Sequence, residues 1–321
     1  MKIRSFKPII LTISTILLFS SCTGSLEPSP TETMAPTMVT DDETTPSFTN
    51  TPGLQPTASP QHTTAPTPTP SPSPTSTAVP TNPHAVVGVE KDDVLNIREG
   101  PGVENPRVGT IPPYGTDIEV VGKSVEVGGS PWVPVHYQGQ QGWVNSHYLA
   151  KQVGQADPQL LEVSNQVLQS IKEKDFSTLV GYVHPDMCLR FSPYPTIQPQ
   201  DLVFCPSEIS TLLADNTQYQ WGQFDGSGKP IRMTFSQYYE RFIYDVDFAH
   251  AEMIGFNQII GTGNAINNIH EFYPQAVFVE YHYPEIDPQY GGMDWRSLRL
   301  VFKKEDMSWF LMGIVHGEWT I

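Results

Sequence analysis

The sequence predicts two folded parts of different class, a small all-β barrel over residues 85–152 and an α+β domain over 155–321. Short strand-like segments separated by glycines fill the first part. Helical periodicity followed by period-two alternation fills the second. Both parts follow an apolar leader at residues 1–22 and a tract of Pro, Thr and Ser at residues 23–84.

The leader has the layout of a secretory signal. A basic start with Lys2, Arg4 and Lys7 precedes eleven mostly apolar residues, Ile9–Phe19, and small residues then lead to Cys22. The apolar run is well short of the ~20 residues that cross a bilayer as a helix. A cysteine at this place resembles the bacterial lipoprotein signal, which implies that Cys22 is lipidated and becomes the new N-terminus. The alternative is a plain secretory leader, and both predict an extracytoplasmic protein.

Residues 23–84 are predicted to be a disordered spacer. They contain fourteen prolines, many Thr and Ser, and almost no large apolar side chains. Such a tract cannot bury enough apolar surface to offset the entropy lost on ordering. In an extended polyproline-II form it spans ~3.1 Å per residue, which would hold the folded part away from the membrane.

Charge and cysteine content restrict the possible partners. The net charge is −16 and no Lys/Arg run occurs, so nucleic-acid binding and polybasic membrane contact are not expected. The membrane contact would be the lipid on Cys22. Cys188 and Cys205 are the other two cysteines, and in an oxidising compartment they either pair as a loop-closing disulfide or remain buried thiols.

The first folded part reads as five or six short strands. The clearest strands are Val94–Arg98, Val108–Ile111, Asp117–Val121, Trp132–Tyr137 and Gly142–Val144, and we expect the last two to form a hairpin through Gln138–Gln141. So many strands in under seventy residues predict a small barrel.

This part resembles the bacterial SH3-like domains. The resemblance rests on Leu95–Gly102, which reads LNIREGPG, and on Gly109–Pro112 and Gly142–Leu149 in the same order and spacing. It implies docking to cell-wall peptides or glycans, that is, to peptidoglycan. Arg98 is expected to brace the turn and Trp143 to pack the barrel. Ligand contact is expected from exposed aromatic side chains, namely Trp132, Tyr137 and Tyr148.

The second part begins with helices and ends with strands. Helices are expected from Pro158, after Asp175 and over Thr234–Tyr244. Strands are expected over 276–283, 297–304 and 309–316. This order resembles the NTF2-like α+β cone, through Lys174–Phe176, His184-Pro185 and Trp309–Val315. That fold serves both enzymes and non-enzymatic pockets. The cone predicts an apolar inner face from alternating residues of two strands: Leu298, Leu300, Phe302, Phe310, Met312 and Ile314.

Candidate chemistry in the second part is sparse. None of its five histidines stands at a metal-ligand spacing, so we expect no metal, no other cofactor and no catalytic residue. His316 is the best pocket candidate because it lies on the final strand. Arg299 is expected either to form a bracing ion pair with Glu280 or Glu318, or to line an anion-binding pocket together with Arg190 and Tyr194.

The sequence therefore predicts a non-enzymatic envelope lipoprotein: a lipid anchor, a spacer, a wall-docking barrel and a domain that binds an unknown small ligand or protein. Two alternatives stay open. One is an envelope-acting hydrolase with a catalytic C-terminal domain, and the other is an adaptor that binds a partner through exposed aromatic side chains.

Overall fold

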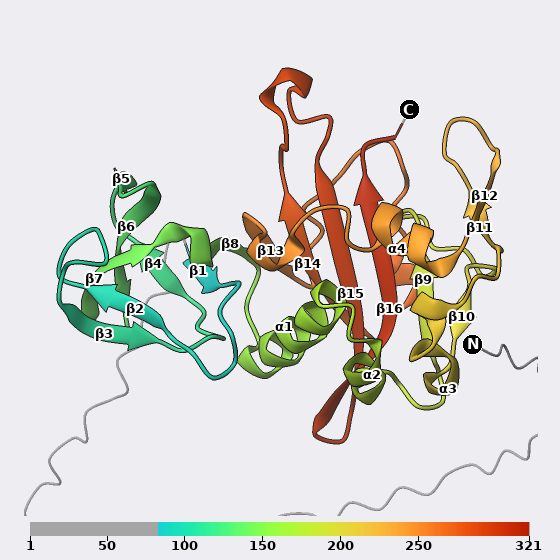
Figure 1. Cartoon of the computed structure of the whole chain (residues 1–321), viewed down its shortest axis with the longest axis horizontal. Coiled ribbons are helices and arrows are strands. Elements are labelled where there is room, and N and C mark those ends of the chain that lie inside the picture. The colour runs from blue at the N-terminus through green and yellow to red at the C-terminus, as the bar shows by residue number, and fades with distance from the viewer. Residues whose placement is uncertain (1–82, 321) are drawn as a thin grey trace, which may run out of the picture. The chain divides into compact units, whose positions relative to one another are not determined.

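The computed structural model describes residues 83–320 (Figure 1). The predicted leader, the predicted lipidation site Cys22 and most of the predicted spacer lie outside the described residues. No helix within the described range has the length and apolar character needed to span a membrane.

The first part is a barrel of short strands. They are β1 (Pro83–Val86), β2 (Leu95–Arg98), β3 (Arg107–Ile111), β4 (Ile118–Val120), β5 (Val125–Val127), β6 (Ser130–Tyr137), β7 (Gln140–Asn145) and β8 (Leu149–Val153). Their inward side chains form one apolar core that includes Leu95, Ile97, Ile111, Val135 and Val144. The predicted strands are all present, and β1 and β8 close the barrel by pairing with each other.

The signature loop after β2 is held by side chains, as the sequence predicted for Arg98. Arg98 donates from Nη1 to the carbonyl oxygen of Asn105 (2.8 Å), and Asn105 donates from Nδ2 to that of Pro101 (2.8 Å). Gly102 has a φ of 111°, a conformation that favours glycine. Two side-chain hydrogen bonds therefore tie this loop to its own backbone.

Two expectations for the β6–β7 hairpin need correction. The turn is Gln138-Gly139 alone, both with positive φ, because Gln140 and Gln141 already pair with β6. Trp143 is only half-buried and lies outside the barrel core. Alternation along β7 points Val144 inward, so its neighbour Trp143 must point outward.

The helices of the second part begin where capping residues predict. Asp157 caps α1 (Pro158–Lys172), accepting from the N–H groups of Gln159 and Leu160. Asp175 and Thr234 cap α2 (Phe176–Leu179) and α4 (Phe235–Phe242). Two further short helices are α3 (Pro206–Ile209) and α5 (Ile269–Phe272).

The strands of the second part do not form a purely antiparallel meander. They are β9 (Leu189–Ser192), β10 (Val203–Phe204), β13 (Met253–Phe256), β14 (Val277–Tyr283), β15 (Arg296–Glu305) and β16 (Ser308–Glu318), with a separate hairpin of β11 (Tyr219–Gln223) and β12 (Pro230–Met233). The predicted strands β14, β15 and β16 pair in antiparallel order as expected, and β13, which was not predicted, adds to β14 in antiparallel orientation. However, β9 adds to β16 in parallel, and β8 of the barrel pairs in parallel with β13. The result is a mixed sheet.

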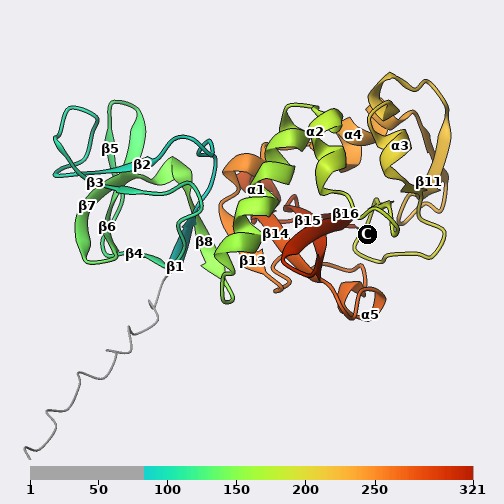
Figure 2. The ribbon, with the colours of Figure 1, turned by 90° about the horizontal axis from the view of Figure 1, so that it is seen from below.

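Helices cover one face of this sheet (Figure 2). Apolar residues of α1 and α4 share a core with the inner residues of β15, including Leu298, Leu300 and Phe302, which are fully buried. The predicted alternation on β15 is therefore correct. Because helices pack directly on it, this face is a filled core and does not line an open pocket.

The expected partner face on β16 is wrong in part because of a β-bulge. Val301 pairs with Gly313 but Phe302 pairs with Leu311, so Met312 is an extra residue in β16. Such an insertion shifts the alternation by one position. Leu311 therefore joins Ile314 in the helix-covered core, while Phe310 and Met312 lie outside it.

Candidate functional site

A groove of about 410 Å³ lies on the barrel. We call it the barrel groove; its walls include Glu90, Asn96, Arg98, Trp132, Asn145 and Tyr148. Two of the three aromatic candidates, Trp132 and Tyr148, thus lie together. Its volume falls within the ~300–1,000 Å³ of typical small-ligand sites.

Strand pairing places these side chains. Trp132 on β6 lies opposite Asn145 on β7, and Tyr148 follows in a 3₁₀ turn, Ser146–Tyr148. The Asn145 side chain caps this turn by accepting from the backbone N–H of His147 (3.0 Å). The groove is therefore built on the barrel's own strands, whose rigidity favours precise ligand contacts.

Several hydrogen-bond donors of the groove are unused. The indole Nε1–H of Trp132 is buried and has no acceptor within residues 83–320. The carboxamide oxygens of Asn96 and Asn145 accept hydrogen bonds from Arg107 and His147, and their NH₂ groups make no hydrogen bond within the described residues. A buried unpaired donor costs free energy, whereas the partly exposed amide groups can pair with a ligand or with water.

Tyr137, the third aromatic candidate, does not line the barrel groove. It belongs to the barrel core and accepts at its hydroxyl from Gln138 Nε2 (3.1 Å). Burial raises its pKa above the usual value. Conversely, Asn96 and Asn145 were missed from the sequence, although both stand within the signature segments.

The family model described as the bacterial SH3 domain matches residues 93–150. These residues form a bacterial SH3 domain. Bacterial SH3 domains generally bind the cell wall, commonly its peptidoglycan. The matched span contains every groove residue named above except Glu90, which precedes it. No curated protein matches the chain.

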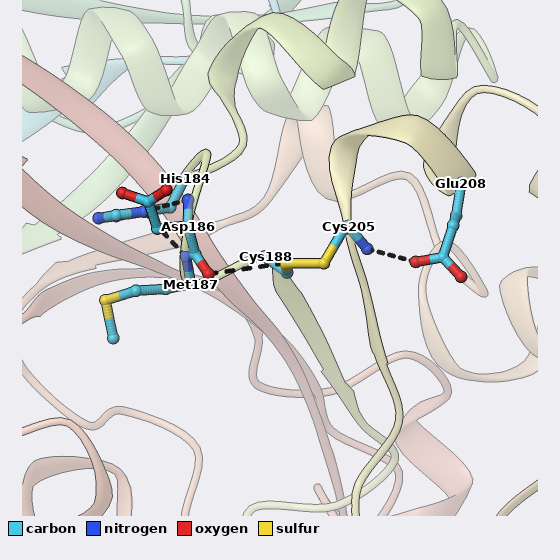
Figure 3. Close-up of a disulfide and its surroundings, with 6 residues drawn as sticks. All are labelled: His184, Asp186, Met187, Cys188, Cys205 and Glu208. Atoms are coloured by element: carbon cyan, nitrogen blue, oxygen red, sulfur yellow. Dashed lines mark hydrogen bonds between the residues drawn. A yellow bond between two sulfur atoms is a disulfide. The ribbon is translucent and has the colours of Figure 1, made fainter. Parts of the chain in front are cut away.

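The remaining candidates lie in the second part, beyond the SH3 domain. Cys188 and Cys205 form a disulfide, with Sγ atoms 1.98 Å apart, next to the β9–β10 pair (Figure 3). The backbone N–H of Cys205 donates to Glu208 Oε2 (2.8 Å) at the start of α3. His184 Nδ1 accepts from the backbone N–H groups of Asp186 and Met187. The cysteines thus staple a loop.

Arg299 is a fully buried brace. Its Nε and Nη2 donate to the two carboxylate oxygens of Glu280 (2.9 and 3.0 Å), and Nη2 also donates to the carbonyl of Gly261. Glu280 is equally buried and accepts from Ser297 Oγ (2.6 Å) and from the N–H groups of residues 260 and 261. Neither charged side chain is exposed to solvent.

His316 is also fully buried. Its Nε2 lies 3.5 Å from Asp245 Oδ2, and Asp245 is itself held by Arg296 Nε (2.8 Å). Burial raises the pKa of the Asp245 carboxyl, but its bond to His316 and the charge of Arg296 outweigh this and lower it. A histidine closed off from solvent cannot meet a substrate, so this pair lacks the access that a catalytic base requires.

Arg190 and Tyr194 do not join Arg299 in an anion site. Arg190 donates from Nη1 to the carbonyl oxygens of Gln198, Pro199 and Asp201, so it holds its own loop. Tyr194 lines a second cavity, described below. Within residues 83–320 no three His, Cys, Asp or Glu side chains gather as metal ligands would.

The burial of His282 beside Glu280 predicts that the stability of the fold depends on pH. Burial lowers the pKa of His282 from 6.5 to about 4, although Glu280 nearby opposes the shift. The unfolded chain therefore binds this proton more readily. His282 contributes its full share to the free energy of unfolding above pH 6.5. As the pH falls toward 4, the free energy of unfolding decreases by about 3 kcal/mol.

We expect His282→Gln to remove this dependence. Glutamine does not titrate and can still reach Ser297, which His282 contacts at 2.8 Å. Free energies of unfolding at pH 7 and pH 4 should differ less in the variant than in the parent. If the free energy of unfolding falls equally in the parent and the variant between pH 7 and pH 4, His282 is not the group responsible.

Proposed function

We propose that this protein is a cell-envelope lipoprotein whose SH3 domain docks to peptidoglycan and whose second domain binds a ligand. The barrel groove carries the first part of this proposal. It combines two aromatic walls with unused amide donors, and it contains two carboxylates and a guanidinium, from Glu90, Asp93 and Arg98. Stem peptides of a cell wall carry both amino and carboxyl groups, which such a mixture suits.

Wall binding should depend on Trp132 and Tyr148. We expect the double variant Trp132→Phe/Tyr148→Ala to bind purified peptidoglycan about tenfold more weakly, because one aromatic wall is made smaller and the other is lost. Phenylalanine keeps the ring at Trp132, which is only 4% exposed, so the barrel should remain folded. Co-sedimentation with peptidoglycan over a range of protein concentrations measures the effect.

Trp143→Phe is the matched control. Trp143 lies on the same hairpin but outside the groove, so this variant should bind as the parent does. Circular dichroism and thermal unfolding verify that each variant is folded. If the double variant and the control sediment equally with peptidoglycan, the groove is not the docking site.

The lipid anchor is proposed from the leader alone. The short apolar run that ends at Ser21-Cys22 supports it. Cys22→Ala should move the protein from the membrane to the soluble fraction, and mass spectrometry of the parent should find a lipid on the N-terminal cysteine. Membrane retention of Cys22→Ala would contradict lipid anchoring and leave wall docking untouched.

For the second domain we propose an NTF2-like domain that binds and does not catalyse. The burial of His316 and Arg299 supports this, because the best titratable candidates have no access to a substrate. An envelope hydrolase is less well supported for the same reason. An adaptor role would need a broad exposed aromatic surface, whereas Trp221, Tyr238 and Tyr281 are fully buried.

A further inference from the structure

The second domain has a cavity of about 750 Å³ that was not predicted from the sequence. We call it the amide cavity. It lies between the loop 193–201, the β11–β12 hairpin with its turn 224–228, and the segment 264–266. The hairpin is separate from the main sheet (Figure 1), so three distant stretches of the chain meet here.

Carboxamides dominate the polar walls of the amide cavity. It is lined by the side chains of Gln198, Gln200, Gln220, Gln223 and Asn264. Those of Gln200, Gln220 and Gln223 are exposed and make no hydrogen bond within the described part of the chain. Each carboxamide offers two donors and one acceptor, which matches a ligand whose groups both donate and accept.

Two aromatic rings complete the walls. Tyr194 and Phe224 are half-buried in the cavity wall, and both rest on Phe242, with ring centroids 5.8 and 6.3 Å from it. Phe242 is fully buried, so the two rings have a fixed support. An aromatic face beside hydrogen-bonding amides suits a ring that is polar at its edge and apolar on its face.

The loop 193–201 is pre-organised. Asn268 binds both the N–H and the carbonyl of Ile197 (2.8 and 2.9 Å). Asp201 Oδ2 accepts from Ser192 Oγ (2.6 Å) and the N–H of Gln198 (2.9 Å). These bonds fix the backbone of the loop, which lowers the entropy cost of binding. The side chain of Gln200 makes no hydrogen bond to any described residue and can pair with a ligand.

The charge of the walls excludes an anion. Among the described residues that line the amide cavity there is no Lys, Arg or His, and its ionisable acids are Asp201 and Asp225. A phosphate, or the free carboxylates of a peptide, would meet repulsion and no counter-charge. Neutral hydroxyl groups would instead pair with the carboxamides and could donate to Asp225.

We propose that the amide cavity binds a neutral oligosaccharide. This site is independent of wall docking by the SH3 domain, because the two share no residue. It gives the second domain a ligand class without requiring any catalytic group. Sugar rings have the hydroxyl edge and the apolar C–H face that the carboxamides and the aromatic rings would contact.

Calorimetric titration of the whole protein tests the proposal with three probes. They are the trimer of N-acetylglucosamine, the β-1,4-linked trimer of glucose, and an acidic tripeptide. We expect at least one of the two neutral sugars to bind at millimolar concentration or below, and the tripeptide not to bind here. Binding of the acetylated trimer alone would assign part of the recognition to its acetamido group.

Variants locate the binding. Gln220→Ala/Gln223→Ala should weaken sugar binding about tenfold, since two hydrogen-bonding side chains are lost from an exposed wall. Gln275→Ala, at an exposed residue outside the cavity, and Trp132→Phe in the barrel groove should bind the sugar as the parent does.

Three results would overturn the proposal. They are the absence of sugar binding at millimolar concentration, binding that survives the double glutamine variant, and tripeptide binding that depends on the same two glutamines. Peptidoglycan binding by the same proteins is measured in parallel. Loss of one activity with retention of the other therefore separates this site from the barrel groove.

Discussion

Glu280→Gln will lower the free energy of unfolding by about 3–5 kcal/mol, the usual cost of removing one partner of a buried ion pair. Glu280 and Arg299 are both 0% exposed at the side chain, and their closest atoms are 2.9 Å apart. The variant leaves the Arg299 guanidinium charged without a counter-charge. It also replaces an acceptor of Ser297 and of two backbone N–H groups with a group that donates at one end.

Chemical denaturation at neutral pH measures this effect, and Glu240→Gln is its matched control. Glu240 also pairs with a cation, Lys174 at 2.6 Å, but its side chain is 60% exposed. An exposed pair is worth less than about 1 kcal/mol, so the control should be nearly neutral. Adding Arg299→Met to Glu280→Gln should recover part of the loss, since both buried charges are then gone. Equal effects of Glu280→Gln and Glu240→Gln would refute the brace.

Cys188→Ser/Cys205→Ser will lower the free energy of unfolding by about 3 kcal/mol. The disulfide joins two cysteines that are 17 positions apart in the sequence. Opening a loop of that size increases the conformational entropy of the unfolded chain, which favours unfolding by roughly 3 kcal/mol. The loop carries Tyr194, Gln198 and Gln200 to the amide cavity. The variant should therefore also weaken oligosaccharide binding if that cavity is the site.

Reduction provides the control for the disulfide. A reducing agent should destabilise the parent by the same amount and leave the double serine variant unchanged. Unfolding is followed by circular dichroism with and without the reductant. If reduction shifts both proteins equally, or shifts neither, the staple does not stabilise this loop.

The barrel was predictable because its information is local. Glycine at Gly102 fixes a turn, Arg98 reaches an adjacent loop, and period-two alternation orients neighbouring residues. The same alternation, applied strictly, would have placed Trp143 outside, since Val144 points inward. Helix starts at Asp157 and Thr234 were equally local, because a capping side chain binds the backbone two or three residues away.

The residues of the candidate site were likewise only partly predictable from local sequence. Trp132 and Tyr148 could be named from the sequence as aromatic residues of the barrel, but Tyr137 could not be separated from them. Whether a strand residue faces a core or a groove depends on the strand packed against it. For Tyr137 that environment is the barrel core, and for Trp132 it is the groove beside Asn145.

In the second domain the sequence determined three of the helices, three antiparallel strands and two possible partners for Arg299. The tertiary structure decided the rest. It selected Glu280 over Glu318, because Glu280 lies directly opposite Arg299 in the β14–β15 register. It shifted the face of β16 at Met312 through a bulge, and it brought glutamines from the loop 193–201 and from β11 into one cavity. Periodicity along one segment carries no information on register or on contacts between distant segments, and these are what build a ligand site.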